Sequence, residues 1–161
     1  MQAGQFDRAL VAIELYLDSF KSEAEAQIWE IWALALNHCL EEAYGKIDKF
    51  IKNNSGHEPD MLLFLKYGLQ GQKAKALASV TERLRGFCQG DEPWSWMLAK
   101  CYALVEEKEE AMRWLEIAAN RGFVNYPFIS KYEPFLKNIR GEAEFKQLME
   151  RVKHEWEHFE E

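Results

Sequence analysis

The chain has 161 residues, of which 48% are hydrophobic, and its formal net charge at pH 7 is −7. This length and composition suit one domain with a sizeable core. No stretch reaches the ~18 uninterrupted apolar residues of a membrane helix, no secretory signal opens the chain, and no basic face suggests nucleic-acid binding. Cys39, Cys88 and Cys101 form no CxxC pair, which predicts free thiols in a reducing, cytoplasmic setting.

The N-terminal third of the chain predicts three helices. The first covers about residues 5–20, where apolar residues recur at the i, i+3, i+4 and i+7 spacing of one helix face. The second begins after Ser22, which with Glu25 forms a capping box, and runs to about Asn37. The third covers about residues 40–52 and ends before a run of turn-forming residues.

The middle of the chain predicts two further pairs of helices. Pro59 and Pro93 stand where the first helix of each pair begins, a position at which proline costs little. The second helices are predicted over residues 73–86 and 108–120. Gly122 is the expected C-terminal stop of the last of these helices.

Beyond Gly122 the pattern changes. The segment to about residue 140 is rich in aromatic residues and is interrupted by Pro127 and Pro134, which predicts short helical turns packed on the preceding pair. Gly141 precedes a last helix with an apolar stripe, and such a stripe would cap the open end of a stack of helices. No segment shows the alternation of a β-strand, so the predicted fold class is all-α.

A period of about 34 residues underlies these helices. Ala9, Ala43, Ala76 and Ala111 are separated by 34, 33 and 35 residues. Apolar residues follow each alanine at i+1 and i+4, so one helix face is repeated four times. Small residues at such positions let neighbouring helices approach closely, and a bulky replacement would overpack the contact.

These residues resemble the tetratricopeptide repeat family, whose unit is a pair of antiparallel helices of about 34 residues. The best match is Trp96 to Tyr102 followed by Ala111 to Ala118, and the segments Gly4 to Leu10 and Gly71 to Leu77 resemble the entry to the family's second helix. The resemblance implies a right-handed α-solenoid. Its parts would be a half repeat over 4–21, repeats over 22–54, 57–87 and 92–122, and an irregular segment with a capping helix over 123–161.

One repeat departs from the pattern. Trp32-Ala33 lies two residues too close to Ala43, which predicts a short or reshaped turn between the two helices of repeat 22–54. The chain also has no first helix before Ala9, which suggests that it is cut from a longer protein. An unpaired half repeat would expose an apolar face, and a homodimer through that face is then plausible.

In this family the first helices line a concave groove that binds peptides or partner helices. Helical phase places seven residues on that face, and these are the candidate peptide-binding residues: Glu30, Leu34, Asn37, Met61, Leu65, Trp96 and Lys100. The predicted function is therefore a protein–protein interaction module, an adaptor or scaffold without catalysis, metal or cofactor. Trp96→Ala would then weaken binding with little loss of stability. The alternative is that the tail or the final helix covers Trp96, Met61 and Leu65.

Two other functions stay open. The chain could be a regulatory or self-association region of a larger bacterial signalling protein, because its tail resembles the ends of repeat regions in such proteins. The sequence His154-Glu155-Trp156-Glu157-His158 fits the HExxH motif of zinc hydrolases. Glu157 is charged where those enzymes have an uncharged residue, no third ligand follows, and Trp156 is assigned to the core-facing stripe, so solvent-facing histidines are favoured. For the pair His38-Cys39, considered together with His57, a structural role is likewise favoured over a site.

Overall fold

The computed structural model describes residues 24–158, and every regular element in this range is helical. The helices are α2 (Ala24–Leu36), α3 (Leu40–Asn53), α4 (His57–Leu69), α5 (Lys73–Ala78), α6 (Glu82–Gly90), α7 (Glu92–Leu104), α8 (Lys108–Asn120) and α9 (Ala143–Glu157), with a π-helical turn η1 (Phe128–Tyr132) and a 3-10 turn η2 (Pro134–Leu136) before the last helix. The predicted all-α class is confirmed for these residues. The predicted helix over 5–20 and the cap at Ser22 lie outside them.

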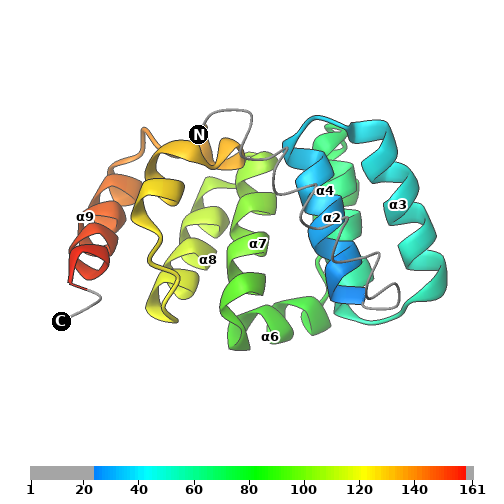
Figure 1. Cartoon of the computed structure of the whole chain (residues 1–161), viewed down its shortest axis with the longest axis horizontal. Coiled ribbons are helices and arrows are strands. Elements are labelled where there is room, and N and C mark those ends of the chain that lie inside the picture. The colour runs from blue at the N-terminus through cyan, green and yellow to red at the C-terminus, as the bar shows by residue number, and fades with distance from the viewer. Residues whose placement is uncertain (1–23, 159–161) are drawn as a thin grey trace.

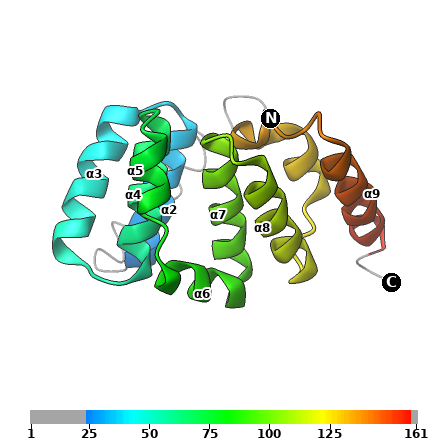
Figure 2. The same cartoon turned by 180° about the vertical axis from the view of Figure 1, so that it is seen from behind.

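The helices are arranged side by side along the long axis of the molecule (Figures 1 and 2). Helix α3 lies at one end, α9 lies at the other, and α7 and α8 lie between them. Most helices pack on the next helix along the chain, most extensively α7 on α8. Helix α6 runs across the ends of the upright helices (Figure 1).

The prediction of one helix over residues 73–86 is wrong, because the chain forms two helices there. Helix α5 ends at Ala78 and α6 begins at Glu82. Thr81 starts α6 as its N-cap: its hydroxyl oxygen accepts a hydrogen bond from the Leu84 N–H at 3.1 Å and donates to Asp60 on α4 at 2.7 Å. A side chain that satisfies the first backbone N–H groups in this way stabilises a new helix start. The break lets α6 leave the direction of α5.

One turn geometry recurs three times between helices, at residues 37–39, 70–72 and 105–107. Its central residue has a positive φ of 60° at His38, 69° at Gly71 and 61° at Glu106. The next N–H then donates to the carbonyl five residues earlier, as in a Schellman motif. These bonds are Cys39 to Leu34, Gln72 to Tyr67 and Glu107 to Tyr102, with lengths of 2.9, 2.8 and 3.0 Å. In each turn, the N–H group after the central residue pairs with a carbonyl at the end of the preceding helix. The chain therefore passes into the following helix in the same way at all three turns.

The expected reshaping of the first of these turns is therefore wrong. The turn after α2 has the length and the hydrogen bond of the other two. The carbonyl that accepts this hydrogen bond belongs to Leu34, nine residues before Ala43. The corresponding carbonyl of the second turn belongs to Tyr67, nine residues before Ala76. The dipeptide Trp32-Ala33 comes directly before Leu34 and is not the equivalent of Tyr67.

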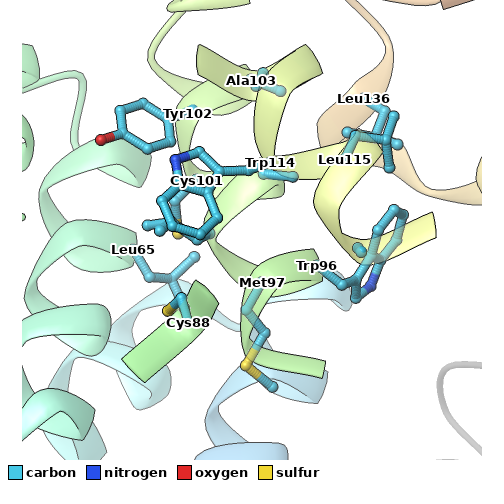
Figure 3. Close-up of a cluster of buried hydrophobic side chains, with 14 of the residues drawn as sticks. Leu65, Cys88, Trp96, Met97, Cys101, Tyr102, Ala103, Trp114, Leu115 and Leu136 are labelled. Carbon is cyan, nitrogen blue, oxygen red and sulfur yellow. The ribbon is translucent and has the colours of Figure 1, made fainter. Parts of the chain in front are cut away.

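The core is centred on α7. Nine consecutive residues of this helix, from Ser95 to Ala103, are all buried. A helix at the surface buries only one of its faces, so this part of α7 is enclosed on all sides. Figure 3 shows side chains of α7 between Leu65 of α4, Trp114 of α8 and Leu136 of η2. The repeated alanines in the described range are completely buried, as expected for close helix contacts: Ala43, Ala76 and Ala111.

The recurring turn predicts opposite effects for two glycine substitutions. Gly71→Ala is expected to lower the free energy of unfolding by about 1 kcal/mol, because a side chain disfavours the left-handed backbone. A Cβ at Gly71 meets no atom within 4 Å, so the cost is one of conformation and not of space. Gly45 lies at an exposed position of α3, and a Cβ there also meets no atom within 4 Å. Gly45→Ala is expected to raise the free energy of unfolding by about 0.5–1 kcal/mol, because alanine favours the helix over glycine.

Urea denaturation of the two variants and the wild-type chain measures both changes. Equal shifts in the same direction would show that Gly71 does not hold a left-handed turn.

Candidate functional site

The seven residues predicted to line a groove are mostly not at the surface. Five of them are buried: Leu34, Met61, Leu65, Trp96 and Lys100. Glu30 and Asn37 are partly exposed, and the Glu30 carboxylate forms an ion pair with Lys46 at 3.0 Å. An open apolar groove on these residues therefore does not exist in this conformation. Peptide binding to them stays a prediction, and it would require their cover to move away.

The cover of Trp96 is the aromatic segment that follows α8. The ring centroid of Trp96 lies 4.5 Å from that of Phe123 and 6.1 Å from that of Phe128. The same segment reaches α2, where Trp32 and Phe135 have ring centroids 6.2 Å apart. The irregular segment thus fills the space beside α7 in which the sequence analysis placed a bound partner. For Trp96 this agrees with the alternative prediction that the tail covers it.

A buried charge lies under this segment. The side chain of Lys100 is only 5% exposed, and its Nζ lies 3.6 Å from Oε2 of Glu133, which is completely buried. The ammonium group also lies 4.1 Å from the ring centroid of Trp32 and 5.4 Å from that of Trp96. A cation over two tryptophan rings gains electrostatic attraction that is strongest where water is excluded. Lys100 is therefore held by one carboxylate and two aromatic faces.

Glu133 also organises the turn in which it lies. Its Oε1 accepts from the Phe135 N–H at 3.2 Å, which caps η2. Its main-chain carbonyl accepts a hydrogen bond from the Arg140 guanidinium, whose pKa is lowered by burial and partly restored by the Glu133 charge. Asn138 donates from its side chain to the carbonyl of Ala103 at the end of α7. These contacts fasten residues 133–140 to the central helix.

The sequence did not single out Glu133. The available signal was the dipeptide Glu133-Pro134, an acidic residue directly before a proline, which is typical of a helix start. That signal predicts a cap but not a partner 33 residues earlier. The pairing with Lys100 depends on a tertiary contact that no local pattern encodes.

A different group of aromatic residues does reach the surface. It consists of Trp29 on α2, His57 on α4, Phe87 on α6 and Trp94 on α7, and is called the aromatic surface below. Trp29 and Phe87 are each 38% exposed. The imidazole of His57 stacks on Phe87 with ring centroids 3.5 Å apart and meets the edge of Trp94 at 5.0 Å.

Helical phase alone could not have found this surface, because four helices from separate parts of the chain contribute one residue each. His57 has aromatic neighbours and a contact of 3.6 Å from its Nδ1 to Glu58, which fits a structural and surface role for this histidine. Two other tryptophans, Trp32 and Trp114, are buried in the core.

The HExxH segment does not form a metal site among residues 24–158, where no group of three potential ligands gathers. The rings of His154 and His158 stack with centroids 4.3 Å apart, and Nδ1 of His158 lies 2.7 Å from the carbonyl oxygen of His154. Trp156 is 45% exposed, so its assignment to the core-facing stripe of α9 is wrong. Burial along that stripe ends at Val152, and the last turn of α9 extends beyond it.

The described thiols differ in exposure. Burial raises the pKa of Cys88 to about 12, with a smaller contribution from the negative charge of Asp91. Burial also raises the pKa of Cys101. A thiol with a raised pKa is protonated at neutral pH and is a poor nucleophile. Cys39 is exposed, in the turn that contains His38.

No family model, curated protein or solved structure matches this chain. No helix of the described residues is long and apolar enough to cross a membrane.

The burial of Trp96 reverses the expectation for its removal. Trp96→Ala is now expected to lower the free energy of unfolding by about 3–5 kcal/mol, because it leaves a cavity beneath Phe123 and Phe128. Thermal and urea denaturation measure this loss. A change below about 1 kcal/mol would mean that the segment after α8 does not cover this side chain in solution.

The buried pair predicts an asymmetry between single and double substitutions. Glu133→Ala is expected to cost about 3–5 kcal/mol, since it leaves the Lys100 charge buried and uncompensated. The double variant Lys100→Met, Glu133→Leu should recover much of that loss, because apolar residues of similar size carry no desolvation penalty.

Lys46→Ala is the matched control for this pair. It removes an ion pair whose lysine is 36% exposed, and it should cost less than about 1 kcal/mol. Equal losses for Glu133→Ala and Lys46→Ala would contradict a buried Lys100–Glu133 interaction.

Proposed function

We propose that this chain is a protein-binding module built as an α-solenoid of tetratricopeptide-like helix pairs, and that it acts in the cytoplasm without catalysis. The recurring turn supports the repeat, because its central residues are 33 and 35 residues apart, close to the spacing of the buried alanines. The family resemblance of Trp96 to Tyr102 and of Ala111 to Ala118 supports the same proposal. Modules of this kind bind other proteins through preformed surfaces.

The aromatic surface is the observation that carries the binding function. Tryptophan is enriched among the residues that dominate binding energy at interfaces. Trp29 and Phe87 are held in place by helices yet remain 38% exposed. Covering that exposed part would contribute roughly 1.5–2.5 kcal/mol per residue, from the 150–250 Å² of an aromatic side chain and about 25 cal/mol per Å². Two such residues and their neighbours offer enough energy for a specific contact.

Acidic residues flank the aromatic surface: Glu25, Glu58, Asp91 and Glu92. Their charge has the same sign as the net charge of the chain, −7. A partner with basic residues at its contact would therefore be attracted over a distance, and its association would slow as salt is added. The binding energy itself would come from the aromatic side chains at the centre.

A peptide selection tests this proposal. A random peptide library displayed on phage is selected on the immobilised wild-type chain, and the recovered peptides are measured against two variants. We expect Trp29→Gln to weaken binding at least tenfold, because it removes an aromatic anchor. Trp156→Gln, at a side chain that is 45% exposed on α9, is the matched control and should leave affinity unchanged.

Two results would contradict the proposal. One is the recovery of no peptide that binds the wild-type chain above background. The other is a set of peptides that bind Trp29→Gln as tightly as the wild type while both variants keep the wild-type stability.

A further inference from the structure

A small cavity lies within the aromatic surface, between the N-terminal parts of α2 and α7. Its volume is about 70 Å³. Trp29, Pro93 and Trp94 line its sides, and the buried side chains of Ile28 and Met97 lie at its base. Glu25 of α2 and Asp91, the N-cap residue of α7, complete the lining with two acidic side chains. The cavity is therefore aromatic in its walls and acidic at its rim.

The size of the cavity decides the class of ligand. Sites for drug-sized molecules or cofactors usually have volumes of about 300–1,000 Å³. A single water needs about 10–15 Å³ by the same kind of measure, so this cavity holds the equivalent of only a few waters. The head group of one amino-acid side chain is the largest ligand that fits. The cavity thus suits one anchor residue of a larger partner.

The charge of the cavity lining indicates which kind of side chain would bind there. Oδ1 of Asp91 accepts from the Trp94 N–H at 3.3 Å as the N-cap of α7, which fixes the carboxylate in place. Among the described residues, no basic group lies within 4.0 Å of the carboxylate of Glu25 or of Asp91. The nearby Arg121 donates instead to the carbonyl of Gly90. Two negative groups at one rim without a described cation favour a positively charged ligand.

The aromatic walls favour the same choice. A cation over a tryptophan ring gains about 0.5–1 kcal/mol at an exposed site and more where water is excluded. Arginine suits this arrangement better than lysine, because its planar guanidinium both stacks on an aromatic face and donates to two carboxylates. An acidic or phosphorylated side chain would meet repulsion at the rim.

We propose that this cavity binds an arginine side chain presented by the protein partner. The inference rests on the proposed function, since it names the residue that the aromatic surface recognises. In the bound state the guanidinium would lie between Trp29 and Trp94 and donate hydrogen bonds to Glu25 and Asp91. Phe87 and His57 would then contact the residues of the partner next to that arginine.

The test uses N-acetyl-arginine methylamide as the probe and follows the indole N–H signals of the full chain by NMR. Trp29→Phe and Trp94→Phe assign the two signals. We expect both signals to shift and saturate with a dissociation constant on the order of 10 mM, as befits one side chain without the rest of a partner. The matched control is N-acetyl-citrulline methylamide, which has nearly the same shape without the charge, and its shifts should be at least fivefold smaller.

Two charge-removing variants locate the site. Asp91→Asn keeps an efficient N-cap for α7, and Glu25→Gln keeps a good helix former in α2. Each is expected to weaken arginine binding at least threefold without changing the melting temperature by more than a few degrees. Equal responses to arginine and citrulline, or wild-type affinity in both variants, would overturn the inference.

The two proposals fail separately. Selected peptides that need Trp29, lack arginine and bind Asp91→Asn and Glu25→Gln as tightly as the wild type would overturn the arginine site and leave the binding function standing. Saturating, charge-dependent shifts of Trp29 and Trp94 support the arginine site even where no library peptide is recovered, a result that counts against the wider binding function alone.

Discussion

The structure is constrained by a lysine whose amino group must find partners inside the core. Helix α7 is buried along nine consecutive residues, and Lys100 is one of them. An isolated ammonium group in such a place would cost several kcal/mol, so the helix can pack only where a carboxylate and aromatic faces meet it. Glu133, Trp32 and Trp96 supply these partners from the segment after α8, from α2 and from α7 itself. The irregular segment after α8 is therefore as much part of the core as the helices before it.

Because the partners of Lys100 occupy the face on which the sequence analysis placed the binding residues, the candidate site lies on another part of the molecule. The face of α7 on which the sequence analysis placed peptide-binding residues is occupied by the partners of Lys100 and by the aromatic rings that cover Trp96. The aromatic surface lies elsewhere, where Trp29, Trp94, Phe87 and His57 come together from four helices. Because Trp29 and Phe87 in this group remain exposed, they are side chains that a partner could stabilise by covering them.

The sequence predicted what local chemistry controls. Pro59, Pro93 and Gly122 mark helix ends through backbone restrictions that act without tertiary context, and these ends are found near the expected positions. The break at Thr81 was missed although its N-cap bond to the Leu84 N–H is local; only its second bond, to Asp60, lies 21 residues away. The burial of Trp96 could not be decided, since helical phase gives the face on which a residue lies and not what covers that face. The aromatic surface required the packing of four helices to be known.

The contact between Trp32 and Phe135 has a consequence for how the chain folds. It joins residues that are 103 positions apart, whereas units of a simple repeat array contact only their neighbours. Such arrays can lose their units one at a time from an end. Here the irregular segment after α8 contacts α2, so α2 cannot melt without removing a contact of residues about 100 positions later in the chain. Such a contact couples the unfolding of distant parts of the chain, as in a globular domain. It also slows folding, because residues far apart in the sequence must come together.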